Sequence, residues 1–89
     1  MKRIRYSSAA KKDLKRYRND PRRMRRLYEV LQYLAAGEPV PAKYLPHKLS
    51  GDYAGCMECH VGGDFLLVWI DEDADTVVVV RVGSHSELF

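Results

Sequence analysis

The stretch DFLLVWIDEDADTVVVVRV, residues 64–82, decides the fold. It contains two runs rich in β-branched and aromatic residues, 64–70 and 76–82, on either side of the acidic sequence 71–75. Such residues favour strands, and a nearly continuous apolar run is typical of a strand in the centre of a sheet. We therefore expect two central strands joined by an acidic turn.

A third strand is predicted immediately before them, over residues 53–61. Side chains of a strand alternate between its two faces, so one face should meet helices while the other forms a polar, concave surface that no helix covers. The helix-facing set is Tyr53, Gly55, Met57, Cys59 and Val61, and the opposite set is Ala54, Cys56, Glu58 and His60. The Pro-rich residues 38–52 should form an irregular connection.

The first 37 residues predict a short strand and two helices. Residues 2–6 can form the strand, with Ser7 or Ser8 as the N-cap of the first helix. Asp20 and Pro21 mark the start of the second helix, and Gly37 marks its end. Apolar residues at helical spacing support both helices: Ala10, Leu14 and Tyr17 in the first, and Met24, Leu27, Tyr28, Leu31, Leu34 and Ala35 in the second.

Together these elements predict an α+β fold with the order β-α-α-β-β-β. An antiparallel helical hairpin should pack on one face of a twisted, mainly antiparallel sheet. The tail, residues 83–89, should be a short turn or a helical stub. With 89 residues, the chain is expected to form a single domain, residues 1–89.

Charge is distributed unevenly along the chain. Residues 1–26 contain 12 Lys or Arg and only two acidic residues, whereas the rest of the chain carries a net negative charge. The net charge of +3 therefore combines a strongly basic N-terminal part with an acidic remainder. A basic segment of this kind indicates a polyanion partner, and a solvated helix face is the alternative. The residues expected to bind RNA phosphates are Lys11, Lys12, Lys15, Arg16, Arg18, Arg22, Arg23, Arg25 and Arg26.

The sequence shows no targeting or membrane signal. The N-terminal residues are charged, and no apolar run approaches the roughly 20 residues needed to cross a bilayer. We therefore expect a cytoplasmic protein with no membrane partner. In that reducing compartment a disulfide between Cys56 and Cys59 is not expected.

The sequence Cys-Met-Glu-Cys-His, residues 56–60, matches the attachment pattern of a c-type haem and resembles half of a zinc site. On a strand, cysteines three positions apart point to opposite faces and cannot hold one ligand together. A zinc ion would also need further ligands. We therefore expect no haem, metal or other cofactor, with Cys59 buried and Cys56 partly exposed.

The polar residues that could carry chemistry lie in the second half of the chain. His47 lies in the irregular connection, His60 on a strand and His85 in the tail, while Asp64 and Arg81 lie at strand ends. Each alone has a structural explanation, such as a turn residue or an ion-pair partner. The predicted strands nevertheless bring His60, Asp64 and Arg81 toward one end of the sheet.

This combination suits cleavage of RNA without a metal ion. A histidine can take or give a proton near neutral pH, and an arginine presents a fork that matches phosphate oxygens. Phe89, the last residue, could stack on a base. The basic helices would bind the surrounding phosphates.

The chain resembles the RelE/ParE toxin superfamily of bacterial toxin–antitoxin systems, and within it the YafQ-type mRNA interferases. The resemblance lies in SAAKKDLKR, GEPVPAKYLPHKLSG, PHKLSGDYAGCMECHVGGDFLLVW and most specifically RVGSHSELF, and it covers nearly the whole chain. It implies a RelE-like α+β domain and a ribosome-dependent endoribonuclease that cuts translating mRNA in the ribosomal A site. It further implies a DinJ-type antitoxin, of the ribbon-helix-helix class, which binds operator DNA together with the toxin.

The resemblance also assigns roles to individual residues. His47, His60, Asp64 and His85 would share proton transfer and positioning, with His85 favoured as general acid and the general base left open. Arg81 would stabilise the phosphate, and Phe89 would help to place the nucleotide.

Three positions depart from the family pattern. Cys56 and Met57 stand where the family usually has Tyr and Arg, and Phe65 stands where it usually has Trp. The missing Arg removes a positive charge near the sheet, which bears on substrate preference. Two other functions fit the same fold: a ParE-like toxin that poisons DNA gyrase by binding, and a non-catalytic RNA-binding module.

Overall fold

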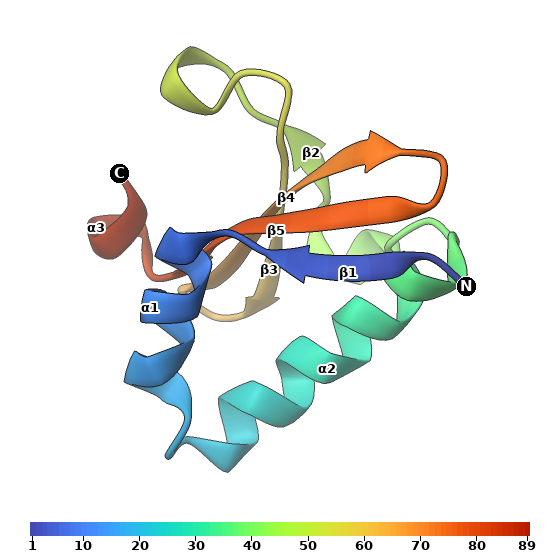
Figure 1. Ribbon diagram of the computed structural model, residues 1–89. Helices are drawn as coiled ribbons and strands as arrows, with labels where there is room; N and C mark the ends of the chain where they lie inside the picture. The colour runs from blue at the N-terminus through green and yellow to red at the C-terminus, as the bar shows by residue number, and fades with distance from the viewer.

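The two apolar runs form central strands, as predicted, in a sheet that has five strands rather than the four expected. The computed structural model describes residues 1–89 and orders the strands β1-β5-β4-β3-β2. The strands are β1 (Arg3–Tyr6), β2 (His47–Lys48), β3 (Met57–Gly62), β4 (Phe65–Asp73) and β5 (Thr76–Gly83). β1 pairs with β5 in parallel, and all other pairs are antiparallel, which confirms the expectation of a mainly antiparallel sheet (Figure 1).

The predicted strand over residues 53–61 starts later than expected. Residues Gly51–Tyr53 form a short 3-10 helix, and Gly55 adopts a φ of 90°, which strands do not allow, so pairing begins only at Met57. The two-residue β2 has no signal in the sequence, because it lies in the irregular connection and exists only through its pairing with β3. Helix α3 (His85–Leu88) fulfils the expectation of a helical stub.

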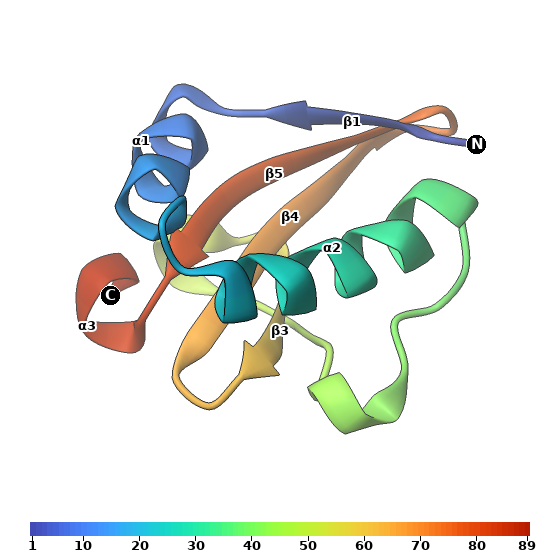
Figure 2. The same ribbon diagram turned by 90° about the horizontal axis from the view of Figure 1, so that it is seen from below.

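The caps of the two long helices agree with the sequence. The Ser7 hydroxyl accepts the Ala10 N–H at 2.9 Å at the start of α1 (Ser8–Tyr17). The Asp20 carboxylate accepts the Arg23 N–H at 3.1 Å at the start of α2 (Pro21–Ala36). Gly37 ends α2 with a left-handed φ of 71°, a conformation that costs glycine little. The helices diverge from their connecting turn as an open V (Figures 1 and 2).

Helices α1 and α2 cover one face of the sheet and enclose the main core (Figure 2). The predicted stripe of α2 is mostly confirmed, but Tyr28 is 56% exposed, whereas Val30 is fully buried. The face of α2 that packs on the sheet is therefore centred closer to Val30 than to Tyr28. In α1 a charged residue is buried beside the apolar residues, since Asp13 is only 2% exposed.

The other face of the sheet is not the uncovered polar surface that the sequence predicts. β4 is apolar on both faces, so Leu66 and Val68 also need cover, and they form a second cluster with Cys56 and Leu88. The cover comes from α3 and from the loop before β3. Tyr53 belongs to this side, not to the helix-facing set, and Cys56 is buried rather than partly exposed.

Helix α1 and its N-cap residue also bind the backbone of β5 beyond the point where β1 ends. The Ser7 hydroxyl donates to the Val80 carbonyl at 2.6 Å, and the Asp13 carboxylate accepts the Val82 N–H at 3.0 Å. Side chains thus satisfy backbone groups that a neighbouring strand would otherwise bind. None of the helices combines the length and the apolar composition required of a membrane span.

Candidate functional site

The three histidines, far apart in the sequence, lie in a row. His60 on β3 stands between His47 on β2 and His85 at the start of α3, with ring centroids 6.2 Å and 6.1 Å away respectively. Phe89 continues the row, with its ring centroid 5.9 Å from that of His85. The ring of Tyr53 meets Phe89 edge-on at 5.4 Å. Four of the predicted site residues, His47, His60, His85 and Phe89, therefore lie together in the structure, and Tyr53 joins them.

Asp64 holds His85 in a defined orientation. One oxygen, Oδ1, accepts the backbone N–H of His85 at 3.0 Å and lies 2.9 Å from its Nδ1. The bonds from the backbone and then from the ring of His85 lower the pKa of the Asp64 carboxyl. A carboxylate at Nδ1 favours the proton on that nitrogen, which leaves Nε2 free to face a substrate.

His47 has a different environment. Its Nδ1 lies 2.9 Å from the Leu45 carbonyl, and its Nε2 lies 3.1 Å from Oε1 of Glu58. A carbonyl oxygen only accepts, so Nδ1 is the donor in that contact, and Nε2 faces the Glu58 carboxyl. Glu58 is 3% exposed, and its Oε2 has no hydrogen-bond partner. His47 is thus held by contacts at both ring nitrogens, whereas no hydrogen bond engages the ring of His60.

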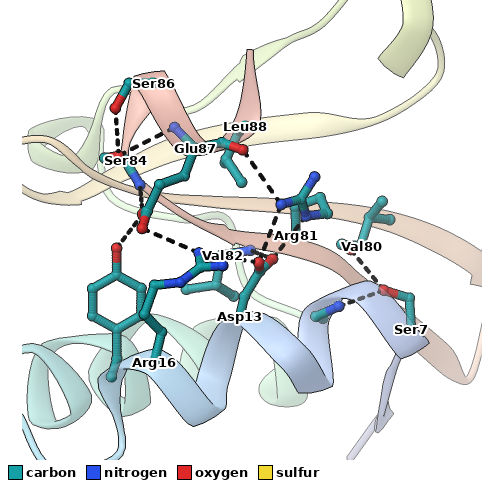
Figure 3. Close-up of polar contacts among 12 residues, drawn as sticks. Ser7, Asp13, Arg16, Val80, Arg81, Val82, Ser84, Ser86, Glu87 and Leu88 are labelled. Carbon is teal, nitrogen blue, oxygen red and sulfur yellow. Dashed lines mark hydrogen bonds and ion pairs between the residues drawn. The ribbon is translucent and has the colours of Figure 1, made fainter.

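Arg81 is the most firmly held of the predicted site residues. Its Nε donates to Asp13 Oδ2 at 2.8 Å and its Nη2 to Asp13 Oδ1 at 3.1 Å (Figure 3). Nη1 donates to the Tyr53 hydroxyl at 3.3 Å, which links Arg81 to the aromatic end of the histidine row. The bonds to Asp13 raise the pKa of the Arg81 guanidinium above its ordinary value.

Sequence reasoning missed three residues of this site: Asp13, Tyr53 and Glu58. Glu58 had a partial signal, since the strand pattern placed it beside His60. Asp13 is an acid in a strongly basic helix, a contrast that could have marked it. Tyr53 carried no distinguishing signal.

The predicted RNA-binding cations are not equivalent in the structure. Arg16 pairs with Glu87 at 3.1 Å and with Asp13 at 3.6 Å, and Arg23 pairs with Asp20 at 2.6 Å. Arg16 therefore serves an internal contact, in contrast to the expectation of a free RNA-binding cation. The predicted cations that are exposed and make no ion pair are Lys11, Lys12, Lys15, Arg18, Arg22, Arg25 and Arg26.

Two open hollows lie beside His60 and Asp64 respectively and share Arg26. One, of about 490 Å³, is lined by His60, Lys43 and Arg26, and the other, of about 350 Å³, by Asp64, Arg22 and Arg26. Arg26 lies across Gly62, where an added Cβ would stand 2.6 Å from its Nη1. Cationic side chains therefore border the space beside two of the predicted site residues, which is an arrangement that attracts phosphate groups.

Helix α3, which carries His85, is tied to α1 through Glu87. The Glu87 carboxylate accepts from the Tyr17 hydroxyl, from the Ser84 N–H at 2.8 Å and from Arg16 at 3.1 Å. The bond from Tyr17 is the main cause of a lowered pKa of the Glu87 carboxyl, whereas burial and the bond to Glu87 raise the pKa of Tyr17 to about 12. Figure 3 shows this cluster between the two helices.

Acid is expected to weaken this tie. A carboxyl whose pKa is lowered on folding stabilises the fold above its ordinary value, 4.5 for Glu87, and loses that contribution as the pH falls through the lower folded value. The difference in Tm between wild type and Glu87→Gln should therefore shrink below about pH 4.5. Thermal unfolding followed by circular dichroism from about pH 3 to pH 7 measures it, and a constant difference would contradict the assignment.

The cysteines take no part in the site. Cys59 lies in the main core and Cys56 in the second cluster, on opposite faces of the sheet, and both are free thiols. Burial raises the pKa of the Cys59 thiol to about 12. No group of three or more His, Cys, Asp or Glu side chains is gathered closely enough to hold a metal ion.

Comparisons with known proteins agree with this fold. Residues 2–89 match the family model of the bacterial toxin of type II toxin-antitoxin system, YafQ. The mRNA interferase toxin YafQ of Escherichia coli is 31% identical over 87 residues, covering 97% of this chain and 94% of that protein. YafQ in the crystal structure of the E. coli DinJ-YafQ complex is 28% identical, with a TM-score of 0.86 and coverage of 100% and 99%.

A further solved structure, of a metal-bound toxin from Helicobacter pylori, is 39% identical, with a TM-score of 0.87 and full coverage of both chains. The family model spans all of this chain except its first residue, and the solved structures share its whole fold. The chain therefore belongs to the YafQ family of bacterial toxins of type II toxin–antitoxin systems.

Proposed function

We propose that this protein is a ribosome-dependent endoribonuclease that cleaves mRNA in the ribosomal A site by acid–base catalysis without a metal ion. The observation that carries the proposal is the row His47, His60 and His85, which continues into Phe89 and, through Tyr53, reaches Arg81. The name of the E. coli relative, an mRNA interferase toxin, supports the same reaction class.

In the proposed mechanism His60 is the general base, because no hydrogen bond engages its ring and it lies at the centre of the row. It removes the proton of a ribose 2′-hydroxyl, and the 2′-oxygen attacks the adjacent phosphorus. Nε2 of His85 donates a proton to the departing 5′-oxygen. The products are a 2′,3′-cyclic phosphate and a 5′-hydroxyl.

The remaining residues stabilise and position the reacting groups. His47, held by Glu58 and by the Leu45 carbonyl, helps to position the reacting phosphate. Arg81 offers its remaining Nη1 hydrogen to a phosphate oxygen, since the Nε and Nη2 edge of the guanidinium is bound to Asp13. Phe89 is 59% exposed and offers a face on which a base can stack.

We propose a cognate DinJ-type antitoxin of the ribbon-helix-helix class as the protein partner, with operator DNA bound only through the complex. The support is the E. coli structure in which YafQ is in complex with DinJ. For the ribosome, the proposed contact is the exposed basic surface of α1 and α2, because ribosomal RNA presents a dense array of phosphates.

The basic surface gives a measurable prediction. Arg22→Gln and Arg25→Gln should each weaken ribosome binding and lower the slope of log Kd against log salt by about 0.7 to 0.9, the value expected for one lost phosphate contact. Arg3→Gln is the matched control, since Arg3 is exposed on β1 and makes no ion pair. Equal effects of all three substitutions would contradict a localised binding surface.

Induced expression followed by primer extension tests the proposed reaction. Cuts within codons of translated mRNA, absent from untranslated mRNA, are the expected result. Growth arrest with intact mRNA and inhibited supercoiling by purified gyrase would instead favour a ParE-like toxin. A phenotype that persists without the histidines but is lost with the basic residues would favour a non-catalytic RNA-binding module.

A further inference from the structure

Asp13 is the only carboxylate of α1, in a helix that otherwise carries basic side chains, and it is 2% exposed. A buried carboxylate is costly unless its oxygens are paired. Both oxygens are paired here: Oδ1 accepts from Arg81, and Oδ2 accepts from Arg81 and from the Val82 N–H. Asp13 therefore binds the side chain of Arg81 and the backbone N–H of Val82 at the same time.

This double contact fixes the plane of the Arg81 guanidinium relative to β5. A fork bound by two oxygens of one carboxylate cannot rotate about its Cδ–Nε bond without losing both bonds. The Nη1 side is thereby turned toward the Tyr53 hydroxyl, which stands next to Phe89 (Figure 3 shows the Asp13 contacts). Arg81 is held in one orientation before any substrate arrives.

The pairing also changes what Arg81 can contribute. The charges of Asp13 and Arg81 cancel as a pair, so the useful element is a directed N–H donor rather than net positive charge. In transition-state stabilisation a donor is effective when it is already placed where negative charge develops. Its loss should then affect the rate of the chemical step and leave substrate binding largely unchanged.

We propose that Asp13 is a positioning residue for catalysis, which acts by holding Arg81 so that its Nη1 edge faces the scissile phosphate. This proposal rests on the proposed function and assigns a catalytic dependence to a residue of α1 that does not itself touch RNA.

The first experiment compares Asp13→Asn with wild type and with Leu31→Ala in single-turnover cleavage of ribosome-bound mRNA. Leu31 is a core residue outside the site, so this variant controls for lost stability. Rates are expressed per folded molecule, with the folded fraction taken from near-ultraviolet circular dichroism. Asp13→Asn should lower the cleavage rate at least tenfold at unchanged KM, whereas Leu31→Ala should cleave at the wild-type rate. An unchanged rate for Asp13→Asn overturns the proposal.

The second experiment uses chemical rescue, which does not depend on the stability of one variant. In Arg81→Ala the carboxylate of Asp13 remains, so added methylguanidinium can bind where the side-chain fork was. Rescue should raise the rate of Arg81→Ala at least tenfold and should be absent in Arg81→Ala/Asp13→Asn. Equal rescue of both variants, or of neither, overturns the positioning role. Absence of cleavage by wild type would instead overturn the proposed function.

Arg81→Lys separates orientation from charge. Lysine keeps the positive charge but cannot bind both carboxylate oxygens in the plane of a fork. It should therefore be as slow as Arg81→Ala in the absence of methylguanidinium. A rate close to wild type would show that charge alone suffices and would contradict the proposal.

Discussion

His85→Ala is expected to lower the rate of mRNA cleavage on the ribosome by about 10²- to 10⁴-fold, the range for loss of one positioned acid or base. The reason is geometric: Asp64 engages Nδ1 at 2.9 Å, so Nε2 is the nitrogen that can protonate the leaving oxygen. Single-turnover cleavage of ribosome-bound mRNA measures the effect. The fold should persist, because His85 is exposed at the start of α3 and makes no core contact.

Asp64→Asn sharpens this test. The amide retains the shape of the side chain but loses the charge that stabilises an imidazolium, so its rate should lie between those of wild type and His85→Ala. The matched control is Asp52→Asn, since Asp52 is exposed and makes no ion pair. If His85→Ala cleaves at the wild-type rate, His85 has no role in the mechanism.

Leu67→Ala is expected to lower the free energy of unfolding by about 2–5 kcal/mol, the range for removing a buried leucine side chain from a core. Leu67 is fully buried on β4, between β3 and β5, and faces the cluster that holds α1 and α2 on the sheet. Urea unfolding monitored by Trp69 fluorescence gives the value.

Leu45→Ala is the control for that measurement, because it deletes the same atoms from a side chain that is 60% exposed. Its effect should stay within about 0.5 kcal/mol of wild type. Similar losses at both positions would mean that the main core does not carry the stability of the fold. An altered m-value would instead indicate a change in the surface exposed on unfolding.

The fold was largely predictable from local patterns. The apolar runs of β4 and β5, the caps at Ser7, Asp20 and Gly37, and the helical spacing of apolar residues correctly located the central strands and the two long helices. The failures have physical reasons. Two-residue β2 depends on a partner strand, and the exposed Tyr28 depends on how α2 is rotated against the sheet, which helical spacing alone cannot determine.

The sequence predicted that several candidate residues lie near one another, but not which contacts each of them makes. Imidazole, carboxylate and guanidinium groups pointed to phosphate chemistry, and the resemblance supplied their identities. The polar face proposed for them was wrong, since β4 is apolar on both sides and its second face is covered. Arg16, expected to bind RNA, instead pairs with Glu87.

The sequence by itself determined the two long helices, the two central strands, the family and the residue types that could do chemistry, because caps, periodicity and motifs are properties of neighbouring residues. The tertiary structure alone decided which group each functional side chain faces. Arg81 meets Asp13 across 68 positions, and His47 meets a buried Glu58 on the next strand. Such pairings arise only when helix and sheet are packed together, since packing removes water from the carboxylates and makes their choice of partner energetically decisive.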